Sequence, residues 1–316
     1  MSIHPPPKAT RVTESLDVAE VAKMTPSSRN RVVDLMRVLA LLIVVLGHWV
    51  MQGVYVDRAD NLHRLGLLDL ATWAHPLTWI LQVMPIFFLV GGYSNALSWR
   101  RAQTRGTTYG AWLHRRAGRL SRPLLPLLVF WAVVAPTIGT LGFGHDWLRI
   151  AGKASLVPTW FLAVYLVVVA LVPLSLALWD RWRFVSLGPG LGLAAIVDIL
   201  SIHFESDVIG AVNLLFVWVT MHQLGYAWLD GTLHGNLRPQ LLAVSGFIGV
   251  VTLVAFGPYG VSMVGVSGFG VDNASPPRIT LLLLGVWQAG IAISLEPYLR
   301  RILERPLIWF VVVVLE

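Results

Sequence analysis

Long apolar segments recur along the whole chain, separated by shorter polar or basic stretches. A transmembrane helix needs about 20 predominantly apolar residues, and about eight segments approach that length with few charges. These segments are 33–53, 74–98, 123–141, 157–178, 184–201, 208–229, 240–257 and 278–296. The pattern predicts an all-α fold, a polytopic transmembrane helical bundle with about eight complete spans.

The two ends of the chain differ from this pattern. A ninth apolar segment begins at Leu307 and stops at Glu316, and at about 1.5 Å per residue it covers roughly half of a bilayer core. We therefore expect either a C-terminally truncated chain or an end that re-enters the membrane.

Residues 1–32 are polar, start with a Pro-rich stretch and lack the apolar core of a signal peptide. They predict a disordered cytoplasmic tail ahead of a transmembrane domain over 33–316.

Composition supports a membrane protein and indicates its orientation. Hydrophobic residues make up 56% of the 316 positions and charged residues only 13%, about half of the share in soluble proteins. If the N-terminus is cytoplasmic, most lysines and arginines fall on the cytoplasmic side, as the positive-inside rule requires. The arginines flank apolar segments, so the net charge of +7 does not indicate nucleic-acid binding. We expect a multi-pass protein of the plasma membrane with its N-terminus in the cytoplasm.

The first span carries polar residues on one face. At about 100° per residue, Asp34, Arg37, His48 and Gln52 fall within an arc of about 60°. A charge at bilayer depth costs about 2.5–3.5 kcal/mol on insertion scales, so such residues usually face a protein interior or a wet cavity. Arg37 and His48 are separated by about 16 Å along the helix axis, and we predict that both face one protein-lined tunnel. Alternatively, Arg37 snorkels to the interface and His48 is a packing residue.

The spacing of Arg37 and His48, with ten residues between them, resembles the opening helix of the integral-membrane acyltransferase family 3. Three further segments are similar to that family: "PIFFLVGGYSNALSWRRA" over 85–102, "RRAGRLSRPLLPLLVFW" over 115–131 and "PTWFLAVYLVVV" over 158–169. The first of them resembles a Phe-Phe-x-x-Ser-Gly motif, but Gly91 stands where the family has its serine. The family usually has more helices than this chain completes.

The resemblance implies a membrane-bound acyltransferase that moves an acetyl or other short acyl group from cytoplasmic acyl-CoA to a hydroxyl. The acceptor would be a glycan, a lipid or another molecule of the cell envelope. His48 would be the general base for the hydroxyl or would carry the acyl group itself, and the sequence does not choose between these roles. Arg37, with Arg115, Arg116 and Arg119, would bind the phosphates of acyl-CoA, although positive-inside topology alone also explains the last three. No metal cofactor is expected.

Two weaker sets of candidates complete the predicted site. Phe87, Phe88, Gly91 and Gly92 could form an acyl channel, but the residue types favour a close helix crossing of the small-residue type. Asp198 lies near the outer end of the fifth span, where it would orient the catalytic imidazole as the third group of a triad does. The alternative for Asp198 is a solvated helix end.

Two rival functions remain open. A secondary transporter would use the polar face of the first span as a proton or substrate path. It should show similarly interrupted helices in its two halves, and the sequence shows no such symmetry. An inactive membrane scaffold is the third possibility, because the incomplete ninth span leaves the bundle unfinished.

Overall fold

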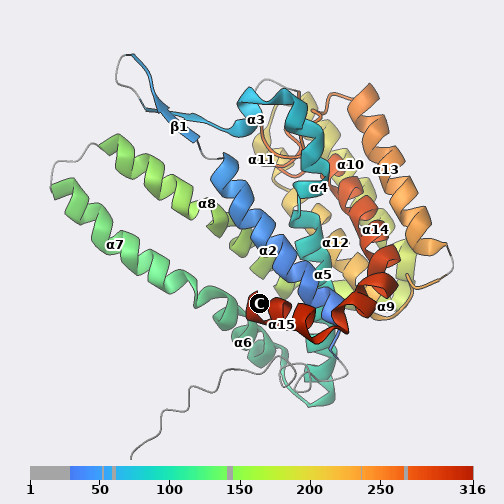
Figure 1. The fold of residues 1–316 in the computed structure, drawn as a ribbon. Coiled ribbons are helices and arrows are strands. Elements are labelled where there is room, and N and C mark those ends of the chain that lie inside the picture. The colour runs from blue at the N-terminus through green and yellow to red at the C-terminus, as the bar shows by residue number, and fades with distance from the viewer. Residues whose placement is uncertain are drawn as a thin grey trace, which may run out of the picture.

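The computed structural model describes residues 29–315 except 52, 59–61, 141–144, 236 and 267–269. The predicted tail lies outside the described residues as far as residue 28. The first helix, α2, already begins at Arg31 and ends at Met51. The described chain is a helical bundle with one small antiparallel hairpin of strands β1 (Gly53–Val56) and β2 (Leu62–Leu65), which extends from the far end of α2 (Figure 1).

The described residues contain six helical segments that are long and apolar enough to cross a membrane. They are α2, Thr72–Thr104 (η1 Thr72–Leu77, α4 Thr78–Leu81 and α5 Met84–Thr104), Val172–His203 (α9 Val172–Trp182, η2 Arg183–Ser186 and α10 Leu187–His203), Asp207–Leu229 (α11 Asp207–Gly210 and α12 Asn213–Leu229), α13 (Arg238–Phe256) and α14 (Ile279–Leu303). A seventh is obtained if α6 (Tyr109–Ser121) and α7 (Leu124–Thr140), bent by 48°, count as one span. The all-α membrane bundle is confirmed, whereas the predicted count of eight complete spans is not.

The largest difference from the sequence prediction concerns the segment 157–178. The structure divides it, because α8 (His145–Ala170) ends before Leu171 and α9 begins at Val172 with a proline in its first turn. Proline lacks a backbone N–H and has a fixed φ, so it starts a helix easily and interrupts one from within. Hydropathy counts apolar residues but does not show where such a run changes direction.

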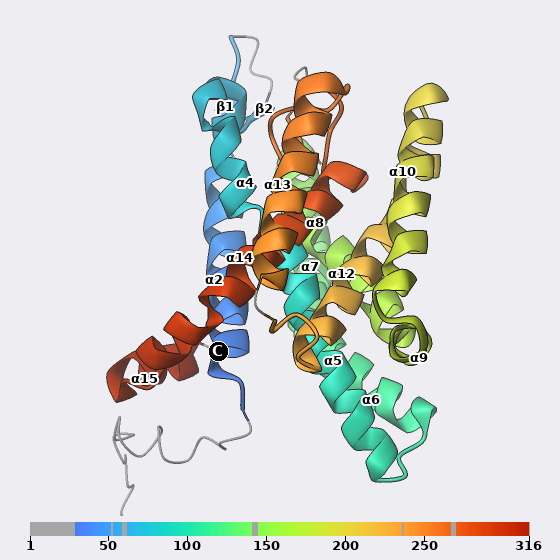
Figure 2. The same cartoon turned by 90° about the vertical axis from the view of Figure 1, so that its right-hand side faces the viewer.

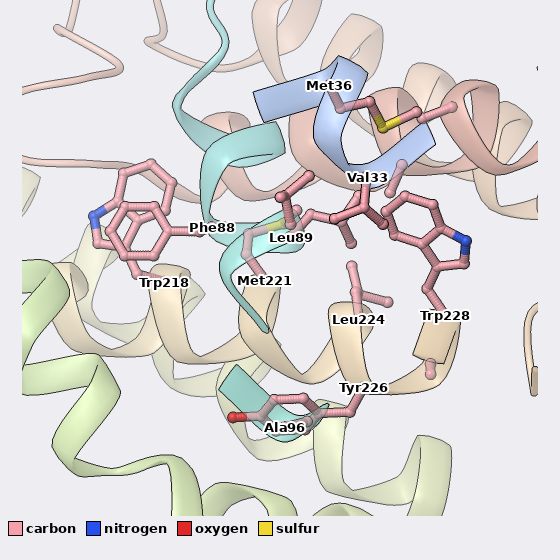
Figure 3. Close-up of a cluster of buried hydrophobic side chains, with 14 of the residues drawn as sticks. Val33, Met36, Phe88, Leu89, Ala96, Trp218, Met221, Leu224, Tyr226 and Trp228 are labelled. Carbon is pink, nitrogen blue, oxygen red and sulfur yellow. The ribbon is translucent and has the colours of Figure 1, made fainter. Parts of the chain in front are cut away.

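The centre of the bundle is the crossing of α5 and α12. Figure 3 shows Phe88 and Leu89 of α5 among Trp218 and Met221 of α12, with Val33 of α2 on the other side of α5. All five side chains are at most 4% exposed. This core is the apolar contact that fixes α2, α5 and α12 relative to one another.

Only the first half of α2 is packed into this core. Its buried residues end at Ala40, and every residue from 41 to 51 is at least partly exposed. Trp49, for example, is 78% exposed. The helix α7, which has no buried residue, stands apart from the rest of the bundle in Figure 1. The sequence predicted an interior-facing polar stripe along all of α2, but the structure packs only its beginning.

The last helix, α15 (Pro306–Leu315), lies across the first turns of α2 instead of running beside it (Figures 1 and 2). Trp309 of α15 is fully buried, and the guanidinium of Arg31 lies 4.8 Å from its ring centroid. We call the end of the bundle at Arg31 the basic end and the opposite end, at β1 and β2, the hairpin end. Short helix α3 (Leu67–Leu70) lies at the hairpin end.

Candidate functional site

A cavity of about 690 Å³ opens at the basic end, and we call it the basic cavity. Its lining includes all four arginines that the sequence predicts to bind phosphates: Arg37 from α2, and Arg115, Arg116 and Arg119 from α6. Residues from α2, α5 and α6 thus converge, although α6 lies about 80 positions after the start of α2. The convergence depends on α6 turning back beside the end of α5 after Gly106, whose φ of +65° suits glycine.

The same lining contains three more arginines that the sequence analysis did not select. They are Arg29, Arg101 and Arg105. Among the described residues that line this cavity, Asp34 is the one acidic residue. The basic cavity therefore has a strong positive charge and can bind an anion with several negative groups.

Arg37 is held in place by neighbouring side chains. Its Nη2 donates to Ser94 Oγ of α5 at 2.9 Å, and its Nη1 lies 3.3 Å from Asp34 Oδ1. The other carboxylate oxygen of Asp34 accepts a hydrogen bond of 2.6 Å from Arg29 Nε. Because Asp34 is buried and contacts both arginines, it orients them towards the cavity.

The first turn of α2 is fixed by a polar network that the sequence analysis missed. Asn30 Oδ1 accepts from the backbone N–H of Val32 at 3.1 Å, and Asn30 Nδ2 donates to Glu296 Oε1 of α14 at 3.1 Å. Glu296, 2% exposed, also accepts from Trp228 Nε1 at 2.6 Å. His234 Nε2 lies 2.8 Å from the same carboxylate. The available signal was a glutamate within an apolar helix, which is costly at membrane depth unless it has such partners.

His48 lies in the unpacked half of α2. Its Nδ1 is 2.7 Å from the backbone oxygen of Val44, one turn earlier. A carbonyl oxygen only accepts hydrogen bonds, so Nδ1 carries the proton in the neutral ring and Nε2 keeps its lone pair. This tautomer suits a general base or a nucleophile that acts through Nε2.

The structure does not join His48 to the basic cavity. The basic cavity and a second, apolar cavity near the hairpin end both lie against α2, and His48 lines neither of them. The predicted common tunnel with Arg37 is therefore not formed by these cavities. Gln52, the last member of the predicted polar stripe, lies outside the described residues.

Contrary to the prediction, Asp198 does not lie beside His48 but takes part in hydrogen bonds that hold several helices together. Its carboxylate accepts hydrogen bonds from Asn213 Nδ2 at 2.8 Å, from Tyr259 Oη at 3.1 Å and from the first N–H of α14 at 2.8 Å. Arg278 Nη1 lies 3.5 Å away. Asp198 is fully buried, so it is not a solvated helix end either. It joins α10, α12 and α14 at the hairpin end, and the triad predicted from the sequence is not observed.

The predicted acyl channel consisted of four α5 residues: Phe87, Phe88, Gly91 and Gly92. In the structure these residues form packing contacts, and they line neither described cavity. Phe88 stacks on Trp218 with ring centroids 4.3 Å apart. A Cβ at Gly92 would collide with the backbone of His222, so α5 and α12 can cross this closely only because that position is glycine. The geometry thus favours the helix crossing over the channel.

A buried polar cluster lies directly behind the wall of the basic cavity. Asn95, next to the cavity residue Ser94, has its Nδ2 3.2 Å from Tyr165 Oη and 3.2 Å from His222 Nε2. All three members of this cluster are at most 5% exposed. His222 is thus part of a buried contact that connects α5, α8 and α12.

A comparison with protein families agrees with the resemblance seen in the sequence. The family model of an acyltransferase domain matches residues 30–314, which includes every helix from α2 to α14 and nearly all of α15. No curated protein and no solved structure matches the chain at a significant level. With six helical segments in its described part that are long and apolar enough to span a bilayer, and a family match over almost its whole length, the chain belongs to the acyltransferase family 3 and is a multi-pass membrane protein.

Proposed function

We propose that this acyltransferase takes an acetyl or other short acyl group from cytoplasmic acyl-CoA and transfers it to a hydroxyl of a glycan or lipid acceptor. The observation that carries the proposal is the basic cavity, where α2, α5 and α6 bring their arginines together. Acyl-CoA carries several phosphate groups, and guanidinium groups bind phosphate through paired, charge-assisted hydrogen bonds. The cavity therefore suits the nucleotide end of acyl-CoA.

The distribution of arginines supports a cytoplasmic location for the basic end. Besides the cavity residues, Arg100, Arg300 and Arg301 lie in the last turns of α5 and α14 or just before them. Basic residues next to membrane helices are retained on the cytoplasmic side, which is also where acyl-CoA would be available. The α2 N-terminus is cytoplasmic in this arrangement.

The chemistry of the transfer requires a base for the acceptor hydroxyl. We assign this role to His48, whose Nε2 has the free lone pair. As Nε2 takes the hydroxyl proton, the oxygen forms the new ester bond with the acyl carbon, and the carbon–sulfur bond of the thioester breaks. The CoA thiolate leaves and receives the proton. Since Arg37 and His48 are about 16 Å apart along α2, the thioester arm must extend from the basic cavity along this helix.

The test is acyl transfer from radiolabelled acetyl-CoA to the lipids and glycans of membranes that contain the protein. We expect Arg37→Ala to raise the KM for acetyl-CoA about tenfold or more, because a hydrogen-bonded charge contributes about 1.5–3 kcal/mol. Arg37→Lys should restore only part of this loss, since lysine cannot bind phosphate bidentately.

The control is Arg301→Ala, which removes an exposed arginine in the last turn of α14 that does not line the cavity. It should leave the KM unchanged. Equal use of acetyl-CoA by wild type and Arg37→Ala would contradict the donor site. Absence of any transfer by abundant wild-type protein would favour the scaffold alternative.

A further inference from the structure

The second cavity, of about 400 Å³, lies against the unpacked half of α2 near the hairpin end, and we call it the apolar cavity. On the α2 side its lining includes Gly47, Val50 and Met51. On the other side, α3, η1 and α4 contribute mainly Leu68, Trp73 and Leu81. Its walls belong partly to the bilayer-facing surface, because Trp73 is 75% exposed and Leu81 is 53% exposed.

Among the described residues of this lining, the polar side chains of Thr78 and Gln82 are already hydrogen-bonded within the protein. Thr78 Oγ1 donates to the backbone oxygen of His75 at 2.5 Å and accepts from Met263 N at 2.8 Å. Gln82 Nε2 donates to Met263 O at 2.8 Å, and its Oε1 accepts from Met84 N at 3.3 Å. The cavity thus offers almost no hydrogen bonds to a ligand. A sugar or another polar molecule would lose its hydration there without compensation, whereas a hydrocarbon chain would not.

The apolar cavity lies directly beside His48 on the surface of α2. Gly47 precedes His48 in the chain, and Met51 lies about 60° from it around the helix. Apart from the two neighbouring residues and the nearby backbone of its own helix, no heavy atom lies within 4 Å of the position that a Cβ at Gly47 would occupy. The missing side chain therefore leaves open space next to the catalytic candidate.

We propose that the apolar cavity binds the alkyl or isoprenyl chain of a lipid-linked acceptor and so presents the acceptor hydroxyl to His48. This inference rests on the proposed function and names its acceptor class. It also accounts for the incomplete burial of α2: every residue from 41 to 51 is at least partly exposed, so an acceptor that is dissolved in the bilayer can reach His48 from the side. The alternative is that bilayer lipids occupy the apolar cavity without selectivity for an acceptor.

The binding test uses a dodecyl glucoside that carries a diazirine at the end of its tail, added below its micellar concentration to the full chain in lipid nanodiscs. We expect photolabelling of residues 67–82, and an excess of unlabelled dodecyl glucoside, but not of methyl glucoside, should suppress it. The variant Gly47→Leu should lose at least about 90% of this labelling, because its side chain fills the cavity. Gly139→Leu is the matched control, since Gly139 on α7 also has open space around it and is remote from this lining.

Equal labelling of wild type and Gly47→Leu, or labelling spread evenly over α7 and α13, would mean that only bilayer lipid occupies the site and would overturn the proposal.

The activity arm compares acetyl transfer to methyl, octyl and dodecyl glucosides. In wild type the kcat/KM should rise about tenfold or more with tail length, because each buried methylene adds to binding, and Gly47→Leu should abolish this rise. Tail-independent transfer would refute the inference but leave the proposed function intact. Selective labelling without transfer from acetyl-CoA to any acceptor would refute the proposed function and leave the binding site intact.

Discussion

At the scale of single residues, contacts within α2 and with α5 position the two functional candidates of α2. The guanidinium of Arg37 is oriented by Asp34 and Ser94, and the tautomer of His48 is set by the carbonyl of Val44. Neither contact needs a bound substrate. Both candidates are therefore positioned by the protein alone, and in the proposed function this lowers the entropic cost of assembling the reacting groups.

The role of His48 can be tested directly. His48→Ala should reduce acyl transfer by about 10²–10⁴-fold, which is the usual contribution of a general base, with protein abundance and the KM for acetyl-CoA little changed. His203→Ala removes another histidine, at the end of α10, and should retain activity. Retained transfer by His48→Ala, measured with radiolabelled acetyl-CoA, would remove this residue from the mechanism.

Charge and helix periodicity were enough to group residues that lie together in the structure. Arg37, Arg115, Arg116 and Arg119 line one cavity, because positive-inside topology and helix geometry place them at the same end; their binding of phosphate stays a prediction. Asp198 could not be assigned correctly from sequence. Its partners, Asn213, Tyr259 and Arg278, lie 15 or more positions away, and a similar depth in the membrane does not mean contact.

At the scale of elements, the position of α2 depends on α14. Asn30 caps α2 through the N–H of Val32 and at the same time donates to Glu296. Asn30 also lines the basic cavity. The cap therefore connects the stability of the helix to the geometry of the basic cavity, the proposed donor site.

Loss of this cap should affect stability and donor use together. We expect Asn30→Ala to destabilise the protein by about 0.5–2 kcal/mol, as the loss of a helix cap does, and to raise the KM for acetyl-CoA. The measurements are the thermal midpoint in detergent and the transfer kinetics. Ser206→Ala removes the cap of α11 at the other end and should lower the thermal midpoint without changing the KM. A change in KM of the same size in both variants would contradict the link to the donor site.

A second link between elements joins α9 to the end of α12 and depends on pH. Burial raises the pKa of the Asp230 carboxyl, but hydrogen bonds from Thr232 and Trp179 and the charge of Arg183 outweigh it, so the pKa is lowered from 3.8. Because the folded pKa is below the unfolded one, Asp230 stabilises the fold fully above the unfolded pKa. This contribution is lost as the pH falls through the folded pKa.

The expected result is a difference in thermal midpoint between wild type and Asp230→Asn that is largest near neutral pH and narrows as the pH falls below about 4. Asp180→Asn is a suitable control, because Asp180 forms an ion pair with Arg100 on the surface, where its side chain is 47% exposed. Such exposed pairs contribute little, so this variant should differ little from wild type at either pH. A difference for Asp230→Asn that does not change with pH would refute the role of its charge.

At the scale of the whole molecule, hydropathy was sufficient to predict a helical membrane bundle but not its exact number of spans. The break at Leu171 lies within an apolar run, so hydropathy does not reveal it. The bend between α6 and α7 lies at Arg122 and Pro123, where a basic helix meets an apolar one, and hydropathy does not show whether the two helices form one span. The sequence pattern also did not show that α2 is exposed beyond Ala40. Periodicity shows which face of a helix is polar, but only the packing of other helices decides whether that face is covered.

The uneven packing of α2 has a mechanical consequence. When a helix is packed only in its first half, a change in its tilt moves the unpacked half most. Membrane helices change their tilt with bilayer thickness. In nanodiscs of longer or shorter lipids, the guanidinium of Arg37 should therefore keep its place, whereas the imidazole of His48 should shift. Affinity for CoA would then be indifferent to lipid length, while the rate of acyl transfer would pass through an optimum at one membrane thickness.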